Sequence, residues 1–408
     1  MKSFKALIFF SIFQVDLVYP STIHEVHNDY PLAPERVTID ESMLSPFQQK
    51  FPSNQKKTST KLAPNLYDKE NYVVHYRNLK FYLQQGLVLK KVHRVLVFNQ
   101  SPWLKGYIDF NTRMRSRSSS DFEKDFYKLM NNSVFGKTQE NLRNRVRVEV
   151  LTNREIALKR VCKPTHKRSY TIHEDLVIMQ TATTNLELNK PLYVGFSVLE
   201  LSKLHMYNFH YCHMLKKYSK INLCFTDTDS LLYEVYTDDI YHDMLQSKDD
   251  YDFSEYPYDH PNYDTKNKKI IGKFKDELHG MTLEEFIGLR PKCYSLLSRG
   301  EVKKNVVEHM NVSEKQTAKG TKSSVKKAFL RHKHYRNVLE NLSTVRVEQN
   351  VLKSRHHDIG TYHQNKIALT AFDTKRWINV DGVHTLAYGH YTTRVENMID
   401  WDDVMDIL

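Results

Sequence analysis

The chain of 408 residues has little of several features that mark particular classes of protein. Its four cysteines stand far apart and form no Cys-x-x-Cys pair, which excludes a zinc ribbon and a disulfide scaffold. This usage favours a reducing, intracellular compartment without naming one. No apolar run is long enough to cross a bilayer, so no membrane partner is expected. Glycine and proline occur only 12 times each, which argues against a low-complexity, disordered chain.

What is present is the composition of a large, basic, globular protein. Hydrophobic residues make up 40% of the chain and aromatic residues 12%, which is enough for two or three packed subdomains. The formal net charge of +12 favours a polyanionic partner, with nucleic acid ahead of an acidic membrane surface.

The N-terminal segment imitates a secretory signal. Lys2 and Lys5 precede an apolar run at residues 6–13, but no small-residue cleavage site follows. We therefore expect a buried strand at the start of an N-terminally truncated chain. The next segment, HEVHNDYPLAPERV at residues 24–37, contains two prolines and predicts an extended connector rather than a regular helix.

Several other segments have predictable structure. We expect a helix over residues 72–85, a strand over 87–98 and a basic, polar break at 113–120. Residues 191–218 predict a short strand that becomes a long helix packed under a sheet. Residues 238–264 are acidic and rich in tyrosine, and they predict a solvated loop, followed by a strand at residues 270–277.

Residues 220–235, KINLCFTDTDSLLYEV, predict a β-hairpin. Apolar strands at 221–225 and 231–235 flank a polar turn that carries Asp227 and Asp229. An Asp-x-Asp turn is ordinary turn chemistry, because aspartate hydrogen-bonds its own backbone there. Two carboxylates on a rigid turn also suit Mg²⁺ in phosphoryl chemistry, since this ion prefers hard oxygen ligands. The pattern aromatic-x-Asp-Thr-Asp-Ser resembles the third polymerase motif of family-B DNA polymerases, which implies that Asp229 is the principal metal ligand and Asp227 a supporting one.

Residues 121–145 predict an amphipathic helix. Its apolar residues fall on one helical stripe and predict core packing. They are Phe122, Phe126, Leu129 and Met130. On the complementary face, polar residues recur at four-residue spacing and lie in a row. They are Lys124, Lys128 and Asn132, with Phe135 and Gly136 one turn further on.

The end of this helix, Lys-x-x-x-Asn-Ser-x-Phe-Gly, resembles the second polymerase motif of family B, with Phe135 where tyrosine is usual. The resemblance implies that Lys128 contacts the phosphates of an incoming nucleotide and that Asn132 and Phe135 shape its base and sugar pocket. Gly136 would let another group approach closely. An ordinary amphipathic helix with a solvated basic face is the alternative.

Two basic segments lie further along the chain. GLRPKCYSLL at residues 288–297 predicts a strand on which Lys292 and Tyr294 share one face. Lys-x-Tyr resembles the primer-gripping element of family B, which implies contact with a primer-terminal phosphate. Residues 315–333 include Lys319 and Lys322 and suit binding to a phosphate backbone, with a disordered basic loop as the alternative.

One part of the expected chemistry is missing. A two-metal mechanism needs carboxylates from two separate strands, and the hairpin provides only one of these two carboxylate-bearing strands. The resemblance implies that the other lies in an upstream Asp-x-x-Ser-Leu-Tyr-Pro motif. Asp16 in VDLVYP is similar only superficially, because the serine is absent and the spacing differs. We therefore expect a Mg²⁺ site that lacks one carboxylate strand in this chain.

The order and spacing of these segments resemble the C-terminal portion of a protein-primed family-B DNA polymerase, as found in organelle plasmids, viruses and self-synthesising transposons. The implied fold is α+β, a right hand with an antiparallel palm sheet backed by helices. The expected parts are a palm edge with an insertion at 1–100, fingers at 101–150, palm at 151–300 and thumb at 301–408. The implied partners are a DNA primer–template, a deoxynucleoside triphosphate and a terminal priming protein.

Two other functions stay open beside DNA-directed DNA synthesis. A catalytically dead fragment would keep the basic grooves, bind nucleic acid with strong salt dependence and incorporate nothing. A reverse transcriptase is disfavoured, because its hairpin normally carries adjacent acids after an aromatic residue, whereas Asp227 and Asp229 are separated by Thr228.

Overall fold

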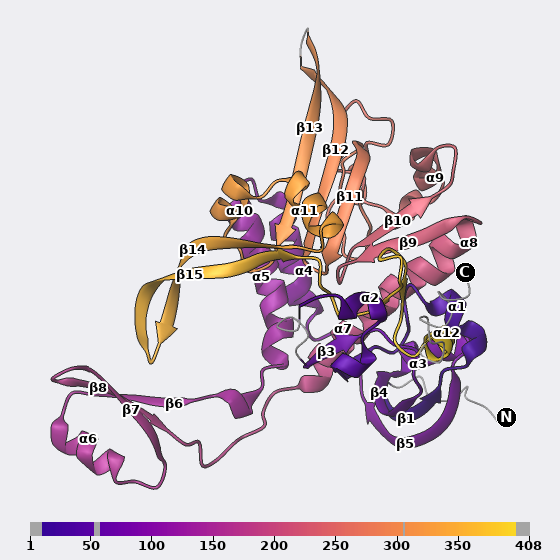
Figure 1. The fold of residues 1–408 in the computed structure, drawn as a ribbon. Helices are drawn as coiled ribbons and strands as arrows, with labels where there is room; N and C mark the ends of the chain where they lie inside the picture. The colour runs from indigo at the N-terminus through magenta and orange to yellow at the C-terminus, as the bar shows by residue number, and fades with distance from the viewer. Residues whose placement is uncertain (1–9, 53–57, 305–306, 397–408) are drawn as a thin grey trace, which may run out of the picture.

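The computed structural model describes residues 10–52, 58–304 and 307–396. It combines helices with several small antiparallel sheets, so the predicted α+β class is confirmed (Figure 1). Within the described ranges, none of the helices is both long and apolar enough to cross a membrane.

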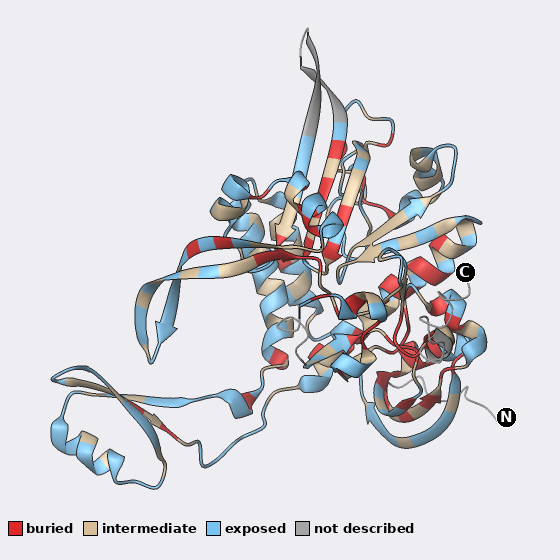
Figure 2. Ribbon diagram, in the orientation of Figure 1, coloured by how far each residue is buried: buried red, intermediate tan, exposed pale blue. Residues whose placement is uncertain are grey.

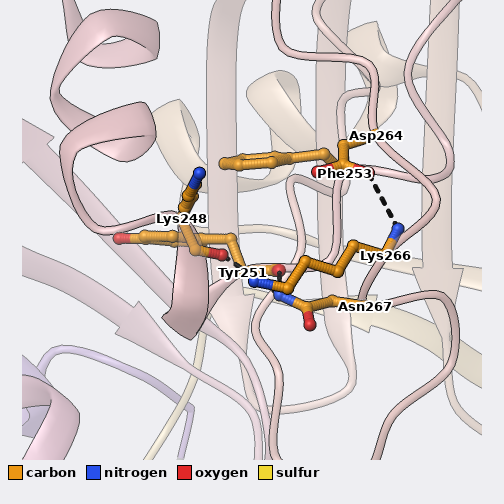
Figure 3. Close-up of a pocket in the computed structure, with 6 residues that line it drawn as sticks. All are labelled: Lys248, Tyr251, Phe253, Asp264, Lys266 and Asn267. Carbon is orange, nitrogen blue, oxygen red and sulfur yellow. Dashed lines mark hydrogen bonds between the residues drawn. The ribbon is translucent and has the colours of Figure 1, made fainter.

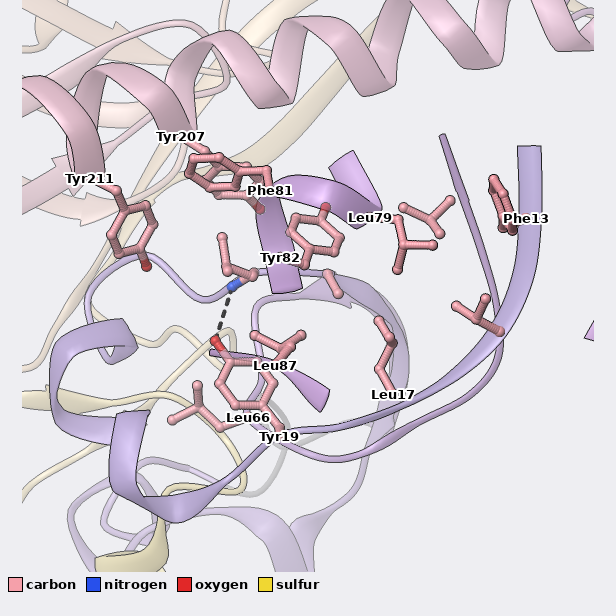
Figure 4. Packing of buried hydrophobic residues seen from close by; sticks show 14 of the residues in the cluster. Phe13, Leu17, Tyr19, Leu66, Leu79, Phe81, Tyr82, Leu87, Tyr207 and Tyr211 are labelled. Atoms are coloured by element: carbon pink, nitrogen blue, oxygen red, sulfur yellow. Dashed lines mark hydrogen bonds between the residues drawn. The ribbon is translucent and has the colours of Figure 1, made fainter. Parts of the chain in front are cut away.

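The N-terminal body is built on a three-stranded antiparallel sheet with the order β4-β1-β5. Alternate residues of β1, Phe13, Val15 and Leu17, face the core, so the expected buried strand is confirmed for the described residues. Tyr207 and Tyr211 pack against them from a helix on the other side of the core (Figure 4). The elements are β1 (Phe10–Val18), β4 (Lys69–His75), α3 (Tyr76–Gln84) and β5 (Val88–Phe98).

The helix expected over residues 72–85 therefore begins later than predicted. Residues 72–75 pair with β1 as the end of β4, and the imidazole of His75 then caps α3 by accepting from the backbone N–H of Arg77. Gly86 follows the helix with a φ of +102°, as expected of a residue at a helix end.

Two helices form the next unit, α4 (Lys105–Arg117) and α5 (Asp121–Thr138). The basic break expected at 113–120 is wrong in part: α4 continues through Arg117, because arginine is a good helix former, and only residues 118–120 separate α4 from α5. The core stripe expected on α5 is also wrong: Phe122 is 79% exposed and Leu129 is 58% exposed. The helix touches α4 through bonds such as Asn131 to Thr112 and leaves its apolar stripe open.

A protrusion follows, which combines antiparallel strands with a short helix. It is mostly exposed or half-buried and stands away from the body (Figures 1 and 2). Its elements are β6 (Arg147–Leu151), α6 (Arg154–Val161), β7 (His166–His173) and β8 (Leu176–Thr181).

The chain then enters a long helix made of α7 (Leu192–Tyr207), the π-helix η6 (Asn208–Met214) and α8 (Leu215–Lys217). The strand expected at its start is wrong, since residues 192 onward are helical. The helix nevertheless packs under the β4-β1-β5 sheet as expected, because Tyr207 and Tyr211 belong to the same buried cluster as β1.

The predicted hairpin is confirmed as β9 (Ile221–Thr226) and β10 (Leu231–Val235). The solvated loop expected at 238–264 is wrong in part: it contains α9 (Ile240–Gln246), and Tyr251, Phe253 and Tyr256 are buried. Phe274 stacks on Phe209 at 3.8 Å between ring centroids and closes this aromatic cluster. The strand expected at 270–277 is wrong, because these residues form turns apart from one bridge at Phe274.

A three-stranded sheet with the order β11-β12-β13 and two helices form the next unit. Residues 315–333 are not a disordered loop, because they end a strand and form helices. A long hairpin then crosses the base of this sheet (Figure 1). The elements are β11 (Thr282–Arg290), β12 (Cys293–Lys304), β13 (Val307–Ala318), α10 (Ser323–Phe329), α11 (His332–Glu340), β14 (Thr344–Arg355) and β15 (Asp358–Thr370).

The C-terminal segment returns to the N-terminal connector. The Arg376 guanidinium donates to the carbonyl of Asn28 at 2.8 Å, and the Asn28 side chain accepts from the N–H of Ala387 at 2.8 Å. The connector is therefore a packed segment, with one helical turn as its only helix within the described residues 24–37. The connector contains α1 (His24–His27) and the start of β2 (Glu35–Ile39). The remaining short elements are α2 (Pro46–Gln49), β3 (Ser59–Ala63), β16 (Trp377–Ile378), β17 (Thr385–Leu386) and α12 (Tyr391–Glu396).

The protrusion and the β14–β15 hairpin touch near the turn of that hairpin. His356 stacks on Tyr170 of β7 at 4.9 Å between ring centroids, and His357 lies 2.6 Å from the amide nitrogen of Gln180. Both histidines have positive φ, 54° and 71°, as in a two-residue hairpin turn that usually takes asparagine and glycine.

Candidate functional site

The turn between β9 and β10 holds Asp227 and Asp229 on a closed backbone. The N–H of Asp227 donates to the carbonyl of Ser230 at 3.1 Å, and the N–H of Asp229 donates to the carbonyl of Asp227 at 2.7 Å. Thr228 between them has a φ of +63°, in the left-handed region. Within the described residues, the Asp229 carboxylate makes no hydrogen bond or ion pair, and the residue is exposed. The rigid turn thus presents two carboxylates, and within the described residues not all of their oxygen atoms are hydrogen-bonded.

The hairpin is fixed to the β11-β12-β13 sheet by an aromatic cluster. Phe225 lies 5.1 Å from Phe286 and 5.3 Å from Tyr294 between ring centroids. Gly288 makes this contact close, because a Cβ atom there would stand 2.7 Å from the Phe286 ring and 3.0 Å from the Phe225 ring. The structure therefore brings Tyr294 next to the strand that leads into the Asp-x-Asp turn.

The sequence predicted that Lys292 and Tyr294 share one strand face, and this prediction is wrong. It sits in the turn between β11 and β12 with a φ of +63°, because Pro291 and Lys292 form the connection of a tight hairpin. Its carbonyl accepts from the N–H of Lys319 at 3.0 Å, so two of the expected basic residues are neighbours.

Lys322 lies one short turn further on. Its N–H donates to the side chain of Gln349 in β14 at 2.9 Å, and the Gln349 amide donates to the carbonyl of Gly320 at 3.0 Å. The ammonium of Lys366 in β15 donates to the carbonyl of Lys319 at 3.4 Å. The base of the β14–β15 hairpin thus gathers Lys292, Lys319 and Lys322 in one basic area.

The row expected on α5 is present and open to solvent. Lys128 and Asn132 are exposed, and Gly136 has no atom within 4 Å of the place where a Cβ would stand. Phe135 is half-buried at the same end of the helix. Lys128 and Asn132 therefore face solvent, and within the described residues their side chains make no hydrogen bond or ion pair. Lys124, in contrast, is half-buried and pairs with Asp121 at 3.0 Å.

The helix of α7 and η6 supports both halves of the site. Near its start, Gly195 lies against Thr138 and Gln139 at the end of α5, where any Cβ would overlap their side chains. Near its end, His210 hydrogen-bonds the hydroxyl of Tyr233 in β10 at 3.0 Å. The helix thereby connects the α5 row to the Asp-x-Asp hairpin through one rigid element.

Two carboxylates upstream of the hairpin, Asp16 and Asp29, differ in their neighbours. Asp16 accepts from the N–H of Asn71 at 2.7 Å and lies 2.8 Å from His93, and these bonds lower its pKa. Burial raises the pKa of the Cys224 thiol in β9, and the negative charges of Glu234 and Asp29 raise it further. Asp29 therefore lies near β9. Nothing in the sequence marked Asp29 as a neighbour of the hairpin, because the contact joins segments almost two hundred residues apart.

A Mg²⁺ ion fits this donor set only in company with a substrate. In the described part of the chain, no group of three histidine, cysteine, aspartate or glutamate side chains is arranged to hold a metal ion. Mg²⁺ is commonly held by one or two carboxylates together with substrate phosphates, however, and the hairpin offers two.

Two hollows lie elsewhere. One is walled by Lys248, Tyr251, Phe253, Asp264, Lys266 and Asn267, and its walls leave no room for a water molecule (Figure 3). The other is a cavity of about 170 Å³ between residues 42–67 and the C-terminal segment, lined partly by Met43, Tyr67 and Trp377. Neither contains a residue of the α5 row or of the hairpin.

No protein-family model, no curated protein and no solved structure matches the chain.

Proposed function

We propose that the chain is the palm, fingers and thumb portion of a family-B DNA polymerase of the protein-primed type. The observation that carries the proposal is the rigid turn with Asp227 and Asp229, packed through Phe225 against Tyr294 and joined by one helix to the Lys128 row. The parts are those expected from the sequence: a palm edge with its insertion at 1–100, fingers at 101–150, palm at 151–300 and thumb at 301–408.

The reaction is template-directed nucleotidyl transfer from a deoxynucleoside triphosphate to a primer. The oxygen of the primer 3′-hydroxyl forms a bond to the α-phosphorus, and the bond from that phosphorus to the pyrophosphate leaving group breaks. Lys128 and Asn132 bind the triphosphate and sugar, Phe135 packs against the base, and Gly136 leaves room for it. Lys292, Lys319, Lys322 and Tyr294 hold the primer strand.

Asp227 and Asp229 would hold Mg²⁺ together with the phosphates, and the ion would supply neutralisation of the charge that develops during transfer. Asp229 matters most, since its carboxylate has no partner among the described residues and Asp227 is bonded weakly to the hydroxyl of Thr228 at 3.4 Å.

The test is primer extension by the chain and by two variants. Asp229→Ala should reduce the rate of incorporation at least a hundredfold, on the order of what removing a group that stabilises transition-state charge costs. Asp175→Ala is the matched control, because Asp175 is also an exposed acid in a hairpin turn, between β7 and β8. Full activity in Asp229→Ala would end the role assigned to this residue.

A second function is favoured by one observation. The hairpin has no third metal ligand in the described residues, and Asp16 already pairs with His93. A chain that binds primer–template and incorporates nothing fits these facts as well. It would show steep salt dependence of binding, because its affinity would come from contacts with phosphates.

A further inference from the structure

The cavity of about 170 Å³ beside the C-terminal segment has the features of a site for a small molecule. Met43, at the end of the short helix η3 (Glu41–Met43), lines one part of it. Three aromatic side chains line much of the rest, and they are Tyr67, Trp377 and Tyr388. Trp377 and Tyr388 are each only 3% exposed, so these aromatic walls belong to the folded interior.

Backbone contacts hold opposite walls of the cavity together. The N–H of Leu66 donates to the carbonyl of Tyr388 at 2.7 Å, and Asn65 forms a β-bridge with Tyr388. Gly389 has a φ of +84°, and a Cβ atom there would stand 2.7 Å from the Tyr67 ring. The Tyr67 ring therefore lies directly on the backbone of Gly389, a contact that only glycine allows. The cavity is thus formed by the fold before any ligand arrives.

One polar group in the cavity wall lacks a partner. The Nε1 atom of Trp377 is buried and makes no hydrogen bond within the described residues. Two hydroxyl groups of the wall, in contrast, already donate: that of Tyr388 to the carbonyl of Thr374 at 3.1 Å, and that of Thr393 to the carbonyl of His390 at 2.7 Å. A buried N–H without a partner costs free energy, so a hydrogen-bond acceptor in the cavity would be stabilising.

The chemistry of the wall restricts the ligand. None of the described residues that line the cavity carries a charge, so an ion would lose its water without gaining an opposite charge. An indole N–H can only donate, which requires an acceptor on the ligand. Flat aromatic walls favour a planar ring. An apolar cavity of roughly 150 Å³ holds one benzene ring, so this cavity has the size for a single six-membered ring.

We propose that the cavity binds a small, neutral, single-ring heterocycle whose ring nitrogen or carbonyl oxygen accepts a hydrogen bond from the Nε1 of Trp377. The ring fills the space between the aromatic side chains, and the acceptor satisfies the buried N–H. The inference does not rest on the proposed function, because neither the α5 row nor the Asp-x-Asp hairpin lines this cavity.

The test compares two probes, pyridine and benzene, which have nearly the same size and shape. Only pyridine carries an acceptor, and it is neutral at pH 8. Each probe is titrated into the full chain, and its binding is followed by ligand-observed NMR. Trp377→Phe keeps an aromatic wall and removes the N–H. The matched control is Trp103→Phe, because Trp103 is 65% exposed and does not line the cavity.

Pyridine should bind the parent chain and the control more tightly than it binds Trp377→Phe, by about fivefold when expressed relative to benzene, because one hydrogen bond contributes about that much. Met43→Phe should weaken binding of both probes, because the larger side chain takes up space in the cavity. Met43 is half-buried, so this second variant tests the site even if Trp377→Phe does not fold.

Two results would overturn the proposal. The cavity is not a ligand site if the parent chain binds neither probe, or if Met43→Phe binds both as the parent chain does. The same ratio of pyridine to benzene affinity in the parent chain and in Trp377→Phe would mean that the indole N–H makes no bond to the ligand.

Discussion

Three buried histidines should make the folded chain sensitive to mild acid. His27, His75 and His210 are almost fully buried, and burial lowers the pKa of each to about 4. Neighbouring charges add to this, from His210 and His24 at His27 and from Arg77 at His75. All three lie in or beside the core under the β4-β1-β5 sheet, where the ring of His27 is 5.1 Å from that of Tyr211.

The direction of the effect follows from proton binding. A histidine in the unfolded chain titrates near pH 6.5, whereas these three take up a proton only near pH 4 when folded. Between these values the unfolded state binds more protons, so the free energy of unfolding falls as the pH falls. At pH 5 the loss is about 2 kcal/mol for each histidine and about 6 kcal/mol for all three. This loss is a large part of the free energy of unfolding of a typical folded protein, which is roughly 5–15 kcal/mol.

The assay is urea unfolding at pH values from 8 to 5, followed by tryptophan fluorescence, with Trp377 as a buried reporter. His27→Gln should have a lower free energy of unfolding than the parent chain at pH 8. Between pH 8 and pH 5, its free energy of unfolding should fall by about 2 kcal/mol less than that of the parent chain. His173→Gln is the control, because His173 is exposed. A free energy of unfolding that stays constant from pH 8 to pH 5 would refute the reasoning.

Two further substitutions test the supports of the site. Phe225→Ala removes the ring that contacts Phe286 and Tyr294 and should lower the free energy of unfolding, measured by thermal unfolding, by about 2 kcal/mol. Phe225→Leu should restore about half of this loss. Unchanged stability in Phe225→Ala would mean that the aromatic cluster does not hold the hairpin. His357 has a φ of +71°, so His357→Val should destabilise the β14–β15 turn by about 2 kcal/mol, as measured by hydrogen exchange. His357→Gly should be close to neutral. Equal effects of the two substitutions would contradict a strained turn.

Local patterns in the sequence predicted the β9–β10 hairpin and the buried strand β1, whereas the strands expected at 270–277 and at the start of 191–218 are wrong. The Asp-x-Asp turn lies between two apolar strands, and pairing of β9 with β10 needs only neighbouring residues. The buried face of β1 was also predictable, because alternation of side chains on a strand is a local property.

Long-range contacts account for what the sequence did not predict. The acidic loop at 238–264 has an aromatic core because Phe274 and Phe209 reach it from other segments. The apolar stripe of α5 stays exposed because no element covers it in the described structure, although periodicity alone predicted burial. Lys292 left its expected strand face because Pro291 starts a tight turn.

The same reasons limit what could be foreseen of the candidate site. The α5 row and the Asp-x-Asp turn were recognised as local motifs, yet their connection through Gly195 and His210 depends on the packing of α7 and η6.

The measurement that tests the central proposal most directly is incorporation of a single nucleotide. The chain is mixed with a labelled DNA primer–template, Mg²⁺ and one deoxynucleoside triphosphate at a time, and the primer length is read. The account predicts extension by one nucleotide with the triphosphate complementary to the template, and none with the other three. Tight, salt-sensitive binding of the primer–template without any extension would contradict it and leave the chain as a nucleic-acid-binding protein.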